Sequence, residues 1–154
     1  MFNDGDVAAL LAHPDALLLD DKGVTEGRTR VATSTHDHVV GFATTRAVDA
    51  VLELEDLFVD PDWMRRGIGR GLVRDTMTVA AHQHIRRVEV TANPHALAFY
   101  GSVGFVCDGD VKTPFGTATR MHLDVARHGG TSRIVARPVT GERPCPGTGT
   151  GSTA

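Results

Sequence analysis

The sequence predicts an α/β domain with a mixed sheet, and three observations carry this prediction. Apolar and polar side chains alternate along Val51–Val59, which is the pattern of a strand. Two shorter alternating runs, 29–35 and 39–46, flank a turn-like segment at 36–38 and predict a β-hairpin. Apolar residues recur at helical spacing between Gly69 and His84, so a helix is expected soon after the central strand.

Further elements precede and follow these three. A short helix is expected over 6–12, and a strand is expected over 88–92, after the long helix. Two last strands are expected over 105–108 and 119–125, joined by a long loop. The elements therefore follow one another as helix, hairpin, strand, helix, strand, helix, strand and strand, an order typical of an α/β domain with a mixed sheet.

A second helix is expected at about 95–103, directly after the strand over 88–92. Asn93 can cap its first N–H groups, and Pro94 fits a first turn, where no backbone donor is needed. Gly104 follows the last helical residue and can adopt the left-handed conformation that commonly ends a helix.

Composition and charge exclude several classes of protein. The chain has 154 residues, of which 41% are hydrophobic and 23% are charged, as expected of one globular domain. Its formal net charge is −3, so it lacks the basic excess that neutralises a phosphate backbone. No apolar run approaches the length of a membrane span. We therefore expect neither a nucleic acid nor a membrane as partner.

The two cysteines, Cys107 and Cys145, show neither a zinc-binding spacing nor a disulfide framework. A reducing cytoplasm is therefore the expected location. His36 and His38 could share a strand face, but they lie in the expected hairpin turn without a nearby third ligand. No metal site is expected.

The composition changes near the C-terminal end of the sequence. Residues 127–154 hold six glycines, three prolines and several arginines, and no aromatic residue. Such a segment buries too little apolar surface to offset the entropy cost of ordering it. We therefore expect a folded domain over 1–126 and a disordered tail over 127–154.

The most informative segment lies between the central strand and the long helix. Here Gly67 and Gly69 stand among three arginines, Arg65, Arg66 and Arg70. Glycine lets a backbone approach a ligand closely, and a helix N-terminus offers unpaired N–H groups and a positive dipole end. The segment therefore predicts an anion site suited to a pyrophosphate.

The glycine-rich segment has three alternative interpretations. A nucleotide-binding P-loop needs Gly-Lys-Ser/Thr at its end, whereas Arg70-Gly71-Leu72 stands here, so that motif is excluded. A dinucleotide fold needs an acidic residue about twenty positions on. Glu89 has roughly that offset, although it lies inside its strand. A glycine-rich turn with surface arginines is the simplest alternative.

Two motifs occur in a fixed order along the chain. The first is Met64-Arg65-Arg66-Gly67-Ile68-Gly69, and the second is NPHALAFY at 93–100, followed by GSVGF at 101–105. The pair resembles the acetyl-CoA-binding motifs of the GNAT superfamily of N-acetyltransferases. These are Gln/Arg-x-x-Gly-x-Gly/Ala and Asn-x-x-Ala-x-x-Phe-Tyr-x-x-x-Gly-Phe, and every fixed position of the second is present. The resemblance covers about 30–125.

The resemblance implies a fold and a cofactor. The sheet of the family is mixed, mostly antiparallel and flanked by helices, and its two central strands, here 51–59 and 88–92, splay apart in a V. The pantetheine arm of acetyl-CoA lies in this gap along the first strand, and the pyrophosphate sits on the loop amides. The residues thereby assigned to acetyl-CoA are Leu57, Phe58, Val59, Met64, Arg65, Arg66, Gly67, Ile68, Gly69, Arg70, Asn93, Phe99 and Tyr100.

The sequence departs from the family pattern at two places. Met64 stands where the family prefers Gln or Arg, so a side-chain contact is lost there, although backbone contacts remain and Arg65 or Arg66 can supply charge. The family usually begins with a strand and a helix before the hairpin, whereas no first strand is evident here. Either the N-terminal part of the fold is shortened, or the true start of the protein lies upstream of Met1. Both alternatives affect the acceptor side of the site, which the early helices of the family commonly shape.

Acetyl transfer from a thioester to an amine uses a base for the amine, a donor for the oxyanion and an acid for the leaving thiolate. Tyr100 is the only tyrosine, and the resemblance makes it the acid that protonates the sulfur of CoA. A buried aromatic that only packs on the sheet is the alternative role. The oxyanion donor would be a backbone N–H near Leu57 or Phe58.

Glu53 and Glu55 are the candidates for the base. Strict alternation would place Glu53, Glu55, Leu57 and Val59 on one face of the strand. Glu53 matches the position that some family members use for a catalytic glutamate, and Glu55 lies one step nearer the gap. Ion pairs with arginine are the alternative role for both carboxylates.

The sequence as a whole predicts a GNAT-type enzyme that moves an acetyl group from acetyl-CoA directly to a primary amine of a small molecule or a peptide. No serine or cysteine has an evident activating partner, so no covalent enzyme intermediate is expected. A non-catalytic acyl-CoA-binding module is the alternative, favoured by Met64 and the short N-terminal part, and a dinucleotide-binding protein is the third. Family members are often homodimers, so the resemblance also implies a homodimer.

Overall fold

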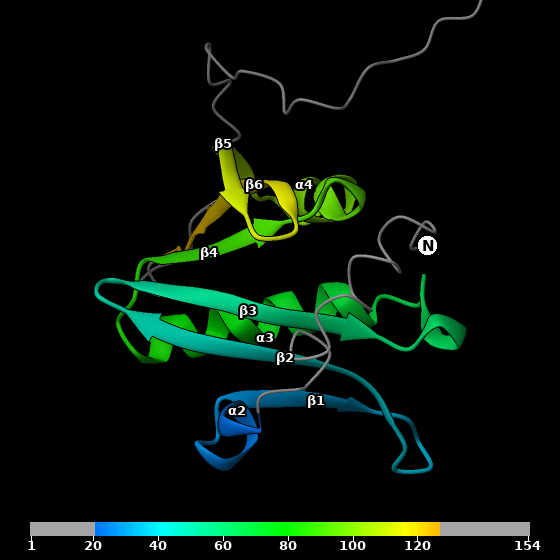
Figure 1. Cartoon of the computed structure of the whole chain (residues 1–154). Helices are drawn as coiled ribbons and strands as arrows, with labels where there is room; N and C mark the ends of the chain where they lie inside the picture. Colours follow the sequence, from blue (N-terminus) through cyan, green and yellow to red (C-terminus); the bar gives the residue numbers. More distant parts are fainter. Residues whose placement is uncertain (1–20, 127–154) are drawn as a thin grey trace, which may run out of the picture.

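The computed structural model describes residues 21–126, and Figure 1 shows their arrangement. The strands are β1 (Thr29–Thr33), β2 (Val39–Val48), β3 (Val51–Val59), β4 (Arg87–Ala92), β5 (Val106–Thr113) and β6 (Gly116–Asp124). They form one sheet in the order β1-β2-β3-β4-β6-β5. Only β3 and β4 pair in parallel, so the predicted mixed and mostly antiparallel sheet is confirmed.

Helices connect the strands and flank the sheet. They are α2 (Lys22–Thr25), α3 (Ile68–His82) and α4 (Leu97–Ser102), with 3-10 helices η2 (Pro61–Trp63) and η3 (Pro94–Ala96). Helix α3 connects the two parallel strands and packs behind β2 and β3 in the view of Figure 1. None of the helices within residues 21–126 is long and apolar enough to cross a membrane.

The hydrophobic core lies between α3 and one face of the sheet. The sheet contributes Leu52, Leu54, Val88, Val90 and Met121 to it, none of them more than 4% exposed. Burying a side chain of this size contributes about 1.5–3 kcal/mol relative to leaving it in water. Because side chains alternate along a strand, the residues between these core positions point to the other face of the sheet.

Strands β3 and β4 pair only near their N-terminal ends. Their ladder joins Leu52–Leu54 to Val88–Val90 and stops there. Beyond it β3 continues to Val59 and β4 to Ala92, and the two strands diverge toward their C-terminal ends (Figure 1). The V-shaped splay that the family resemblance implies is therefore present.

A β-bulge in β3 lies at the place where the two strands separate. Thr44 of β2 pairs with Asp56, but the next residue of β2, Thr45, pairs with Leu54, so Glu55 is the extra residue. A bulge bends its strand, increases the local twist and interrupts the alternation of side chains. The bulge at Glu55 therefore accompanies the departure of β3 from β4.

The bulge also changes which side chains of β3 share a face. Leu57 and Val59 pack against the core on the same side as Leu54. The expectation that Glu53, Glu55, Leu57 and Val59 share one face is therefore wrong. It assumed a regular strand, whereas the extra residue at position 55 shifts the alternation of all later residues.

Other boundaries differ from the prediction in detail. The segment 109–118, expected as part of a long loop, extends β5 to Thr113 and begins β6 at Gly116, so only two residues remain for the turn. The helix expected at 95–103 is divided into η3 and α4, and α2 was not expected. The helix expected over 6–12 and the tail expected over 127–154 lie outside the described residues.

Candidate functional site

A pocket of about 610 Å³ lies at the splayed end of β3, between this strand, the N-terminus of α3 and α4. The residues that line it are Leu57, Val59, Met64, Arg65, Gly67, Ile68, Gly69, Arg70, His95, Ala96, Phe99, Tyr100 and Ser102. Ten of the thirteen residues that the family resemblance assigns to acetyl-CoA are among them. The two motifs, which are separated in the sequence, therefore meet at one pocket.

Phe58, Arg66 and Asn93 are the three assigned residues that do not line the pocket. The ring of Phe58 stacks on Phe42, with 5.7 Å between the ring centroids. The guanidinium of Arg66 lies over the ring of Trp63, 4.7 Å from its centroid. The side chain of Asn93 accepts a hydrogen bond of 3.0 Å from a backbone N–H of η3, so the predicted cap is confirmed.

His95, Ala96 and Ser102 line the pocket although the sequence did not assign them. They lie within or directly after the second motif, on η3 and α4. Ala96, Phe99 and Ser102 recur every third residue, which places them on one side of a helical segment. This periodicity was the signal in the sequence that could have added Ala96 and Ser102, whereas His95 lies outside it.

The chain between β3 and α3 bends sharply before the helix starts. Arg65 has a φ of 61°, and Gly67, the N-cap residue of α3, has a φ of 82°. Glycine adopts this left-handed conformation without the steric cost that other residues incur. No side chain caps the first N–H groups of α3, so these donors and the positive end of the helix dipole are available to an anion at the pocket.

Gly69 allows α3 to approach its neighbours closely. A Cβ atom at this position would lie 3.1 Å from Cζ of Phe99 and 3.6 Å from Cγ2 of Val59. Arg70 also connects the two helices, because its Nη2 donates a hydrogen bond of 3.4 Å to the carbonyl oxygen of Ser102. The start of α3 is thus held against β3 on one side and α4 on the other.

Tyr100 lines the pocket but is only 7% exposed. Its ring makes edge-to-face contacts with Phe99 and Phe105, each with 5.2 Å between ring centroids. Burial, together with the negative charge of Asp56, raises the pKa of Tyr100 to about 12. The phenol therefore stays protonated at neutral pH and can act as a hydrogen-bond or proton donor.

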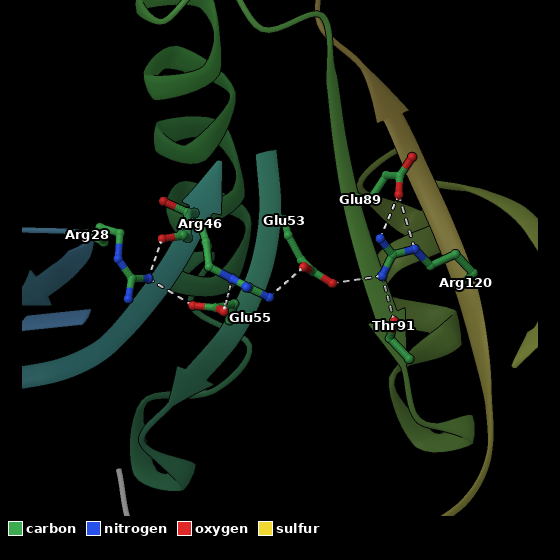
Figure 2. A network of polar contacts seen from close by, with 8 residues as sticks. Arg28, Arg46, Glu53, Glu55, Glu89, Thr91 and Arg120 are labelled. Atoms are coloured by element: carbon green, nitrogen blue, oxygen red, sulfur yellow. Dashed lines mark hydrogen bonds and ion pairs between the residues drawn. The ribbon is translucent and has the colours of Figure 1, made fainter. Parts of the chain in front are cut away.

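Glu53 and Glu55 are each held by two arginines (Figure 2). The Oε1 atom of Glu53 lies 2.9 Å from Arg120, and its Oε2 atom lies 3.1 Å from Arg46. The Oε1 atom of Glu55 lies 2.6 Å from Arg46, and its Oε2 atom lies 2.9 Å from Arg28. Neither carboxylate belongs to the lining of the pocket. Both glutamates thus make the ion pairs that the sequence left open as their alternative role.

Glu89, His36 and His38 are the other residues that the sequence offered as site candidates. Glu89 lies in the middle of β4 and is paired with Arg120, whereas a dinucleotide fold would place its acidic residue at the end of that strand. His36 and His38 lie exposed in the β1–β2 turn. Within the described residues, no group of three or more His, Cys, Asp or Glu side chains is arranged to hold a metal ion.

Known proteins with similar structures share this fold at low sequence identity. A proposed streptothricin acetyltransferase from Bacillus anthracis, in complex with acetyl coenzyme A, is 21% identical over 62% of this chain and 61% of its own, with a TM-score of 0.58. The ribosomal-protein-S18-alanine N-acetyltransferase from Escherichia coli is 22% identical over 86% of this chain and 96% of its own, with a TM-score of 0.58. Nourseothricin acetyltransferase is 20% identical over 66% of this chain and 68% of its own, with a TM-score of 0.59.

A match to a protein family along most of the sequence identifies the family of this chain. Residues 21–123 match the family described as Acetyltransferase (GNAT) domain. The matched range is more than half of the chain, and it contains both motifs and every residue that lines the pocket. The chain therefore belongs to the GNAT acetyltransferase family.

Proposed function

We propose that this protein is an N-acetyltransferase that moves the acetyl group of acetyl-CoA directly to a primary amine. The observation that carries the proposal is the pocket at the splayed end of β3, where the bend at Gly67, the close contact at Gly69 and Tyr100 meet. The pantetheine arm would extend along Leu57–Val59, and the diphosphate would bind at the N-terminus of α3. One structural relative is a complex with acetyl coenzyme A, which supports this co-substrate.

The residues around the pocket fit such a co-substrate in shape and charge. The segment of β3 beyond Leu54 has no pairing with β4, so its backbone groups on that side can bond an extended ligand. Arg65 and Arg70 add positive charge at the end of the pocket where a diphosphate would lie. Acetyl-CoA would supply the activated acetyl group as a thioester.

The chain's own groups would assist transfer in three ways. A backbone N–H near Leu57 or Phe58 would stabilise the oxyanion that forms when the amine attacks the carbonyl carbon. As the C–N bond forms and the C–S bond breaks, Tyr100 would donate from its phenolic oxygen toward the leaving sulfur. Glu53 or Glu55 would accept the proton that the attacking amine loses, either directly or through water.

The acceptor class is proposed only as a primary amine of a small molecule or a peptide. Two structural relatives are named for nourseothricin and streptothricin, and a third for an alanine of a ribosomal protein. The fold therefore serves acceptors of both kinds, and the net charge of −3 favours a cationic acceptor. A homodimer and a cytoplasmic location stay predictions of the sequence.

Calorimetry followed by a thiol-release assay tests the proposal. Acetyl-CoA is expected to bind the full chain, and NAD, titrated in parallel, is not. Free thiol is then expected to appear when acetyl-CoA is supplied with at least one member of a panel of amines, amino acids and peptides. Binding of acetyl-CoA without turnover on any amine would instead support the acyl-CoA-binding module, and binding of NAD alone would support the dinucleotide-binding alternative.

The role of the two glutamates is tested by comparing Glu53→Gln with Glu55→Gln. A base is inactive when protonated, so kcat/KM falls on the acidic side of the pH profile. The variant that lacks the base is expected to lose that acidic limb and about 100-fold or more in kcat. The other variant loses similar ion pairs but keeps the limb, and so serves as the matched control. If both variants keep it, neither glutamate is the base.

A further inference from the structure

The sheet face opposite α3 carries a row of alternating charges (Figure 2). The row, here called the charge row, consists of Arg28, Glu55, Arg46, Glu53, Arg120 and Glu89. Each member is ion-paired with the next in this order, and the three arginines balance the three glutamates. The charge row passes from β3 to β4 at the Glu53–Glu89 position, one pair before the end of their ladder.

Arg120 makes the crossing between the two strands. Its side chain starts on β6, where it pairs in register with Thr91 of β4. Its Nη2 and Nε atoms lie 2.6 and 3.1 Å from Oε2 of Glu89 on β4. Its Nη1 atom lies 2.9 Å from Oε1 of Glu53 on β3 and 2.8 Å from Oγ1 of Thr91. One guanidinium therefore connects three neighbouring strands.

These contacts surround the point where the V opens. Glu53 and Glu89 are partners in the ladder, one position before its last pair. Thr91 is the first residue of β4 beyond the ladder. Arg120 thus bonds both strands on the paired side and also holds the first residue of the splayed side.

Partial burial makes solvent screen this bridge less than it screens a surface ion pair. The side chain of Arg120 is 27% exposed, and those of Glu53 and Glu89 are 24% and 19% exposed. The Arg87–Asp124 pair, which also joins β4 to β6, is 43% and 69% exposed. Solvent screens such an exposed pair, so its contribution is small.

Arg120 also compensates the repulsion between the two glutamates, Glu53 and Glu89. Glu53 and Glu89 are directly opposite across β3 and β4, and like charges in opposite positions destabilise a strand pair. Arg120 lies between them and compensates both charges. Without it, repulsion would act on the last part of the ladder and widen the V from its closed end.

We infer that Arg120 is a positioning residue that holds the V closed at its apex and so sets how far the pantetheine arm enters between β3 and β4. It acts through Glu53 and Glu89 and touches no substrate itself. By fixing the depth of entry, it fixes where the thioester stops relative to Tyr100. The inference rests on the proposed function, because it assumes that acetyl-CoA occupies the gap.

Calorimetry on the full chain with two ligands tests the inference. One is acetyl-CoA, and the other is 3′-phosphoadenosine 5′-diphosphate, which keeps the diphosphate but lacks the pantetheine arm. Arg120→Gln is expected to weaken acetyl-CoA binding about tenfold and to change binding of the fragment by less than about twofold. A fragment that binds too weakly for direct titration is measured by competition with acetyl-CoA.

Two further variants separate positioning from general destabilisation. Arg87→Gln removes the other arginine that joins β4 to β6 and is expected to leave the affinity for both ligands unchanged. The double variant Arg120→Gln/Glu89→Gln removes the repulsion and is expected to regain more than half of the lost affinity for acetyl-CoA. If Arg120→Gln does not fold, Arg120→Lys replaces it, because lysine keeps the charge but cannot reach Glu53, Glu89 and Thr91 together.

The outcomes distinguish the inference from the proposed function. If Arg120→Gln weakens the binding of both ligands equally, Arg120 has a structural role only. If the binding of both ligands is unchanged, Arg120 has no role in binding. Either result overturns the inference. In both cases wild-type binding of acetyl-CoA leaves the proposed function standing. If the wild type binds no acetyl-CoA, the proposed function fails, and the inference fails with it.

Discussion

Replacing Gly69 with valine is expected to remove acetyl-CoA binding, with a loss of affinity of about 100-fold or more. The Cβ atom alone would lie 3.1 Å from the ring of Phe99 and 3.6 Å from Val59, and valine adds two methyl groups beyond it. The N-terminus of α3 must then move away from β3 and α4. The amides that would bind the diphosphate move with it, and calorimetry with acetyl-CoA measures the loss.

Gly71 provides the matched control in the same helix. A Cβ atom there would meet nothing within 4 Å, so Gly71→Ala is expected to bind acetyl-CoA as the wild type does. Alanine is also favoured over glycine inside a helix by up to about 1 kcal/mol, so thermal stability should not fall. Thermal melting identifies any Gly69→Val protein that is unfolded. A folded Gly69→Val protein with unchanged affinity would contradict the placement of the diphosphate at this bend.

Signals that act over a few residues were sufficient to predict much of the pocket. Strand β3 has the bounds Val51–Val59 that alternation indicated, because a half-buried strand imposes that pattern on its own residues. Asn93 caps the following turn as predicted, since capping depends on neighbours within three residues. Gly67, at the bend between β3 and α3, was identifiable because a sharp bend favours glycine wherever it occurs.

The bulge at Glu55 could not be predicted in this way. It is defined by the register of β3 against β2, in which Thr44 and Thr45 skip one residue of β3. The alternation of the run VLELEDLFV breaks at the adjacent polar residues Glu55 and Asp56, but such a break alone does not distinguish a bulge from an exposed stretch of a regular strand. The prediction was therefore right about the strand and wrong about which of its residues share a face.

The distant ion-pair partners of the candidate bases could not be predicted from the sequence either. Arg120 lies 67 positions from Glu53, and Arg28 lies 27 positions from Glu55. The Arg120–Glu53 pair forms only when the sheet order brings β6 beside β4 and β4 beside β3. The Arg28–Glu55 pair forms only when Arg28, which directly precedes β1, lies beside β2 and β3. The sequence could state that arginine ion pairs were an alternative role for these carboxylates, but it could not identify the two distant arginines, Arg120 and Arg28.

The segment 109–118 was misinterpreted for a related reason. Its glycines and proline indicate a loop when each is counted as a turn residue. In the structure Gly109 instead lies at an irregularity within the β5–β6 pairing, and only Pro114 and Phe115 separate the two strands. A glycine in a strand can mark a bulge as well as a turn, and the pairing partner decides between the two.

Replacing Tyr100 with phenylalanine is expected to lower kcat by about 10- to 100-fold and to leave the affinity for acetyl-CoA almost unchanged. The ring keeps its contacts with Phe99 and Phe105, so the pocket retains its shape. Only the phenolic donor is lost. Steady-state kinetics with saturating amine measures kcat, and calorimetry measures the affinity. An unchanged kcat would leave Tyr100 with the packing role alone.

The raised pKa of Tyr100 determines how this donor can work. With a pKa of about 12, the phenol loses its proton only as the pH approaches that value, so wild-type kcat should show no alkaline limb from Tyr100 below about pH 10. An ordinary thiol has a pKa near 8.5, so complete proton transfer from this phenol to a free thiolate is unfavourable. Tyr100 is therefore expected to assist by a hydrogen bond that strengthens as negative charge develops on the sulfur. Such a bond contributes about 1.5–3 kcal/mol, which is the origin of the modest expected loss in Tyr100→Phe.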